Sequence, residues 1–168
     1  ELAMYFFALR PSIDCFEKRG RKGYLLTIGD EKPYGAVLSG HVRHHMGDKL
    51  TANIPTKQVV RELQKRYHYF HIVPTNTAHG RSDDVQGCWR SLLGERVLML
   101  EDEAAVCETI ALAIGLSEGT AADLARSVDD LVRAGHDRRA AAAAARALAA
   151  HSPARPSRLA SSVFMPRT

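Results

Sequence analysis

Three short apolar runs, each followed by apolar residues at helical spacing, constrain the fold of this chain more than any other feature. The runs cover residues 24–28, 68–73 and 96–100. Strands that alternate with helices pair in parallel, and the connecting helices pack on the faces of the sheet. The sequence therefore predicts an α/β fold with three layers, in which a mostly parallel, Rossmann-like sheet lies between helices.

The first apolar run ends at a pair of carboxylates. Residues 24–28 are apolar on both faces, as a central parallel strand requires. The run stops at Gly29 and is followed by Asp30 and Glu31. In open α/β sheets, ligands bind beyond the carboxyl ends of the strands. Asp30 is therefore the first candidate functional residue, and we expect its strand to be central in the sheet.

The remaining patterns divide the chain into three parts. Pro33 to Met46 keeps helical spacing, so we expect a helix there. Residues 140–150 are mostly alanine, which favours a helix but buries little apolar surface, so we expect that helix to be peripheral. The predicted organisation is an α/β part over residues 1–116, a helical extension over 117–150 and a flexible tail over 151–168.

Composition excludes several classes of protein. The 168 residues are 45% hydrophobic and 25% charged, which is ordinary for a globular chain. Three widely spaced cysteines form neither a disulfide framework nor a zinc motif, which favours a reducing, cytoplasmic compartment. No apolar run approaches the roughly 20 residues of a membrane span. Part of the net charge of +4 lies in an arginine-rich end without interleaved aromatic residues, so it does not predict nucleic-acid binding.

The strand ends resemble a known family. The run Leu25-Leu26-Thr27-Ile28-Gly29-Asp30-Glu31 resembles the Thr-Asp-Gly type of motif that ends a central strand of von Willebrand factor A domains. The stretches Ile-Asp-Cys-Phe-Glu-Lys-Arg-Gly (13–20) and His-Ile-Val-Pro-Thr-Asn-Thr (71–77) are similar to those of bacterial, uncharacterised proteins that carry this domain. The resemblance covers residues 1–116 and implies the C-terminal half of such a domain, truncated on its N-terminal side.

The resemblance implies a non-enzymatic module that binds a protein partner, with no catalytic residues. It also implies that Asp30 and Glu31 contribute to a Mg²⁺ site in the intact protein, with Thr27, Thr75 and Asn76 at the same edge. Two departures limit this expectation: no Asp-x-Ser-x-Ser motif occurs in the chain, and Gly29 precedes the aspartate instead of following it. Asp30 is therefore expected to be one ligand of a site whose other ligands this chain does not contain.

Histidines offer the alternative chemistry, a metal-dependent hydrolase that uses Asp30 with His41, His44 or His45. On a helix, His41 and His45 share one face at a spacing that can chelate zinc. No glutamate stands at the position that an H-E-x-x-H motif needs, which favours exposed imidazoles. His68 and His71 lie in one strand on opposite faces, so we expect that they do not converge on one metal.

A parallel sheet that lacks its earlier strands leaves one edge without a neighbour. Exposed strand edges and apolar patches promote association between chains. We therefore expect the chain to self-associate through this uncovered edge.

Overall fold

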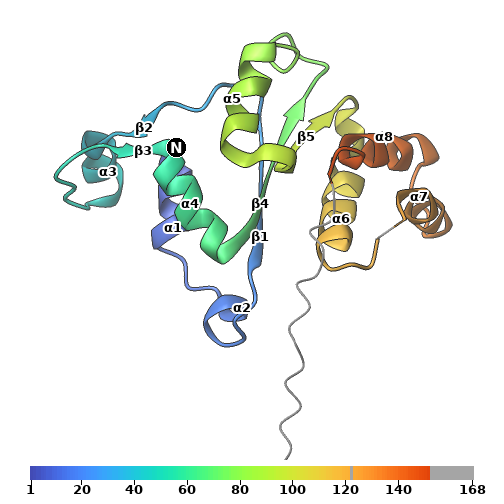
Figure 1. Cartoon of the computed structure of the whole chain (residues 1–168), viewed down its shortest axis with the longest axis horizontal. Helices are drawn as coiled ribbons and strands as arrows, with labels where there is room; N and C mark the ends of the chain where they lie inside the picture. Colours follow the sequence, from blue (N-terminus) through green and yellow to red (C-terminus); the bar gives the residue numbers. More distant parts are fainter. Residues whose placement is uncertain (122, 152–168) are drawn as a thin grey trace, which may run out of the picture.

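Helices and strands alternate along the chain as predicted. The computed structural model describes residues 1–121 and 123–151 (Figure 1). The strands are β1 (Gly23–Ile28), β2 (Ala36–Val37), β3 (Ile54–Pro55), β4 (Tyr67–Pro74) and β5 (Val97–Leu100). The α-helices are α1 (Leu2–Leu9), α2 (Asp14–Glu17), α3 (Ser39–Met46), α4 (Thr56–Arg66), α5 (Asp83–Leu93), α6 (Val106–Ser117), α7 (Leu124–Arg133) and α8 (Arg138–Leu148). The predicted flexible tail, residues 151–168, lies outside the described residues apart from His151.

The main sheet is parallel and has the order β1-β4-β5. Residues 23–28 of β1 pair with residues 67–72 of β4, and residues 71–74 of β4 pair with residues 97–100 of β5. The predicted α/β class with a parallel sheet is confirmed. The expectation that β1 is central is wrong, because β4 occupies the centre and β1 lies at one edge of this sheet. Apolar residues on both faces require cover above and below a strand, but they do not require a neighbour on each side.

Helices cover both faces of the sheet (Figure 1). Side chains of β4 alternate between two apolar clusters, one on each face, and each cluster is closed by helices. Tyr69 and Val73 point to the face covered by α4 and α5, and α1 packs against α4 on the same side. Phe70 and Ile72 point to the opposite face, which α6 and α8 cover. In α4 the inward stripe consists of three buried residues, Val59, Val60 and Leu63, at the spacing of one helical face.

Only the second part of the segment 33–46 is helical. α3 begins at Ser39, and β2 precedes it and pairs with β3 in an antiparallel ladder of two residue pairs. The prediction of one helix from Pro33 is wrong. Gly35 lies where the extended segment begins, and an isolated glycine weakens a helical pattern.

The alanine-rich helix α8 is a core element, which corrects the prediction that it is peripheral. It packs against α6, α7 and β5. Its inward side chains are buried, and they are Ala140, Ala141, Ala143, Ala144, Ala147 and Leu148. Small side chains bury little area each, but they let helix backbones approach closely and fill a narrow space at normal density.

We expect Ala144→Leu to destabilise the fold by about 2 kcal/mol, because Ala144 is fully buried and added methylenes overpack the core. Ala111→Leu, at an exposed position of α6, is the matched control and is expected to change stability by less than about 0.5 kcal/mol. Urea unfolding monitored by circular dichroism compares the two variants. Equal stability of both would show that α8 does not pack as described.

Candidate functional site

The chain leaves β1 through a turn that His71 fixes from the neighbouring strand. The Gly29 backbone N–H donates to the Ile72 carbonyl at 3.1 Å, which extends the ladder by one bond. The Gly29 carbonyl accepts from Nε2 of His71 at 3.1 Å. The His71 side chain is only 3% exposed, so this bond is made away from water. The first residue after β1 is thus held through both its backbone groups.

His71 is part of a buried chain of polar groups that links β1 to β4. Burial lowers the pKa of His71 to about 4, although the hydrogen bond to Gly29 opposes this shift, so the ring is neutral at pH 7. Because a carbonyl only accepts, Nε2 carries the proton and Nδ1 accepts from the Thr27 hydroxyl at 2.7 Å. The Thr27 oxygen lies 3.2 Å from the Tyr69 hydroxyl, which donates to it. Thr27 was predicted to contribute to the carboxyl edge of the sheet. Its hydroxyl instead forms hydrogen bonds with the side chains of His71 and Tyr69 in the neighbouring strand.

Trp89 of α5 fixes the other side of the same turn. Its indole stacks on the His71 ring, with ring centroids 3.5 Å apart and planes inclined by 19°. Its Nε1–H donates to the Glu31 carbonyl at 2.9 Å. The carbonyls of Gly29 and Glu31 are therefore both held, and Asp30 lies between them.

The carboxylates of the turn differ in their surroundings. The Asp30 side chain is half-buried, and no hydrogen bond or ion pair of its carboxylate occurs within residues 1–121 and 123–151. Glu31 is exposed, and its carboxylate lies 3.3 Å from Nδ1 of His79. The neighbouring Lys32 forms an ion pair with Asp84 at 2.6 Å. Asp30 is therefore the acidic residue of this turn that lies between two held carbonyls and whose carboxylate has no hydrogen-bond partner among the described residues.

Thr75 and Asn76 follow β4 at the same edge of the sheet but are engaged toward β5. The Thr75 hydroxyl donates to the Leu100 carbonyl at 3.3 Å. The Asn76 amide donates to the Glu103 carboxylate. Because β1 and β4 are adjacent and parallel, both pairs, Asp30–Glu31 and Thr75–Asn76, follow their strands at one edge of the sheet. No hydrogen bond joins Asp30 to Thr75 or Asn76.

The loop after β4 is tightly folded at Gly80. Its backbone N–H donates to the Thr77 hydroxyl at 2.9 Å, and that hydroxyl donates to the Pro74 carbonyl at 3.1 Å. A Cβ at Gly80 would lie 1.9 Å from the Pro74 oxygen, so only glycine fits this close approach.

The histidines do not assemble around Asp30. His41, His44 and His45 are exposed on α3, with the rings of His44 and His45 4.6 Å apart. Within the described part of the chain, no group of three or more His, Cys, Asp or Glu side chains could hold a metal ion. Asp30 and the histidines of α3 therefore do not form a group of three metal ligands among these residues.

His68 and His71 lie on opposite faces of β4, as predicted. The ring of His68 stacks on Tyr24, with centroids 5.0 Å apart, whereas His71 stacks on Trp89 on the other face. Burial and the nearby Arg96 lower the pKa of His68. The two imidazoles therefore do not share a ligand.

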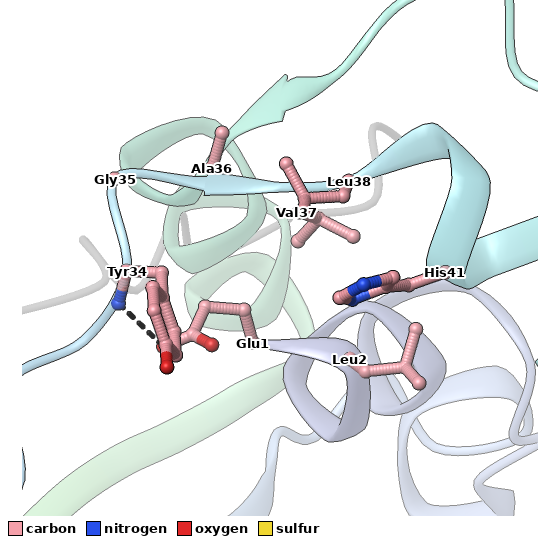
Figure 2. Close-up of a pocket in the computed structure, with 8 residues that line it drawn as sticks. All are labelled: Glu1, Leu2, Tyr34, Gly35, Ala36, Val37, Leu38 and His41. Atoms are coloured by element: carbon pink, nitrogen blue, oxygen red, sulfur yellow. Dashed lines mark hydrogen bonds between the residues drawn. The ribbon is translucent and has the colours of Figure 1, made fainter.

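A pocket of about 360 Å³ lies between β2 and the start of α1 (Figure 2). The extended segment 35–38 forms one wall, and the side chains of Leu2 and His41 stand opposite it. At one end, the Tyr34 N–H donates to the Glu1 carboxylate at 2.7 Å. The lining is mainly apolar, and of the predicted site residues only His41 belongs to it.

Comparison of the chain with protein-family models, with curated proteins and with solved structures found no match.

Proposed function

We propose that this chain is a non-enzymatic protein-binding module that presents the turn after β1, with Asp30 at its centre, to a partner. The observation that carries the proposal is the fixed position of Asp30 between two held carbonyls. Preorganised groups bind with a smaller loss of conformational freedom than mobile ones. The resemblance of residues 25–31 to the strand end of von Willebrand factor A domains supports the same role.

We further propose that Mg²⁺ joins Asp30 to the partner. The oxygen donors at this edge, from Asp30, Glu31 and the side-chain carbonyl of Asn76, are of the kind that Mg²⁺ prefers. Mg²⁺ usually keeps several waters and needs only one or two protein carboxylates, so a carboxylate of the partner can complete the shell. The described residues supply only part of such a site, which is why a partner is part of the proposal.

The three cysteines support a cytoplasmic location for the module. Cys15, Cys88 and Cys107 are all free thiols, which a reducing compartment maintains.

Among residues 1–121 and 123–151, no helix is long and apolar enough to cross a lipid bilayer.

Paramagnetic Mn²⁺, which shares the oxygen preference of Mg²⁺, tests the proposal without knowledge of the partner. We expect Mn²⁺ to broaden the amide NMR signals of residues 29–31 first, and excess Mg²⁺ to reverse the broadening. Asp30→Asn removes the charged ligand and should weaken the effect about tenfold.

Asp14→Asn is the control, because Asp14 is an exposed aspartate of α2, which precedes the start of β1. It should leave the broadening at residues 29–31 unchanged. Equal broadening in wild type and Asp30→Asn would remove Asp30 from the site.

A further inference from the structure

The outer edge of β1 carries backbone groups without a strand partner in the described part of the chain. In the ladder with β4, the Gly29 N–H points to Ile72, and successive residues of a strand point to opposite edges. The N–H and C=O groups of Tyr24, Leu26 and Ile28 therefore point outward. Three residues, with six backbone groups, are available for pairing.

Within the residues that the structure describes, this edge lacks the features by which proteins protect exposed strands. Natural edges carry lysine, proline, a bulge or a covering segment. β1 has the sequence Gly-Tyr-Leu-Leu-Thr-Ile, without charge or proline, and it pairs regularly with β4 along its whole length. Ile28 is 56% exposed. The strand is therefore suited to accept another strand.

We propose that the occupant of this edge is β1 of a second copy of the chain, paired antiparallel about a two-fold axis perpendicular to the sheet. Such an axis keeps each face of the sheet on the same side. Two residues directly opposite each other in an antiparallel ladder either both point their N–H and C=O groups at the other strand or both point them away. The residues whose backbone groups point outward must therefore lie opposite one another. Leu26 then faces Leu26 of the second copy, and Tyr24 faces Ile28. A shift of two residues in either direction would set Ile28 against Lys22 or Tyr24 against Asp30, so one register pairs all the apolar residues.

The same register brings opposite charges together. Lys22, just before the strand, lies opposite Asp30 of the second copy. The two-fold axis repeats this pair, so two ion pairs flank the apolar centre. Opposite charges across an antiparallel pair stabilise it, and like charges destabilise it. The strand is basic at its start and acidic at its end, which makes it complementary to its own reversed copy.

Sedimentation equilibrium of the full chain in EDTA, over a range of concentrations, measures this association. We expect a reversible monomer–dimer equilibrium. Lys22→Glu sets like charges opposite each other twice and should raise the dimer dissociation constant about tenfold, as should Asp30→Lys. The double variant Lys22→Glu/Asp30→Lys restores opposite charges in this register and should restore the dimer.

A backbone substitution tests the strand edge independently of charge. The Ile28 N–H points away from β4, so Ile28→Pro removes no hydrogen bond within the monomer and is compatible with an edge strand. We expect it to weaken the dimer at least as much as Lys22→Glu, with unchanged circular dichroism. Leu38→Lys, at another exposed apolar position, is the control and should leave the dimer intact.

Three outcomes would overturn the proposal. A wild-type chain that stays monomeric at all concentrations shows that this edge does not pair with a second copy. A double charge variant that remains as weak as the single variants shows that the register is wrong. A dimer that persists in Ile28→Pro shows that another surface, such as the exposed Phe6 and Phe7 of α1, holds the copies together.

Discussion

Lowering the pH from 7 to 4 is expected to destabilise the fold by about 3 kcal/mol through His71 alone. Burial lowers the pKa of this imidazole to about 4, whereas its ordinary value is 6.5. Between these values the unfolded chain binds a proton that the folded protein excludes, so stability decreases as the pH falls. The gap of about 2.5 pKa units corresponds to about 3 kcal/mol. The contribution of His71 to the free energy of unfolding is therefore greatest above pH 6.5, and its loss is complete only below about pH 4.

Urea unfolding at a series of pH values measures this loss. In His71→Gln the amide can still donate to the Gly29 carbonyl but does not titrate, so the dependence on pH should become shallower by about 1.4 kcal/mol per pH unit between pH 6 and 5. Burial also lowers the pKa values of His68 and His151, and these groups account for part of the remaining slope. His41→Gln, at an exposed imidazole, should keep the wild-type slope. An unchanged slope in His71→Gln would show that His71 is not excluded from protonation.

Replacing Trp89 by alanine is expected to cost about 4 kcal/mol, the largest effect of any substitution considered for this protein. The indole is 6% exposed and stacks on His71. It belongs to the apolar cluster that α4 and α5 form with one face of β4. Its removal leaves a cavity and also frees the Glu31 carbonyl. Chemical unfolding followed by circular dichroism measures the loss.

Trp89→Phe separates packing from hydrogen bonding. The phenyl ring keeps most of the stack on His71 but cannot donate to Glu31, so we expect a loss of about 1 kcal/mol. Amide hydrogen exchange in residues 29–32 should accelerate more than exchange in β5, because the turn loses one of its two anchors. A Trp89→Phe variant with wild-type exchange in the turn would show that the indole N–H does not hold it.

The alternation of strands and helices could be predicted because it depends on local spacing. Residues 68–73 alternate between two faces, so the opposite orientation of His68 and His71 followed directly from the strand period. Which strand is central depends on pairing between segments about 40 residues apart, and the apolar run of β1 carries no information about its neighbours. The buried role of α8 was missed for a related reason, because alanine content predicts a helix but not the space that the helix fills.

The candidate site was predicted in position but not in construction. The end of an apolar run located Asp30 at the carboxyl edge of the sheet. The groups that hold the turn, His71 and Trp89, come from β4 and α5, and their convergence depends on the register of β1 against β4 and on the packing of α5. One signal was available: Thr27, Tyr69 and His71 are polar residues at inward positions of two apolar strands, where each needs a partner.

The position of α8 has a consequence for the order in which the protein can fold during synthesis. All three strands of the sheet are complete at Leu100, yet Phe70, Ile72 and Leu98 share a cluster with side chains of residues 140–148. After the last residue of the sheet has been synthesised, the ribosome must therefore add nearly fifty more residues before α8 can complete that cluster. Until α8 emerges, α6 covers only part of this apolar face, and the rest is open to chaperones and to other nascent chains.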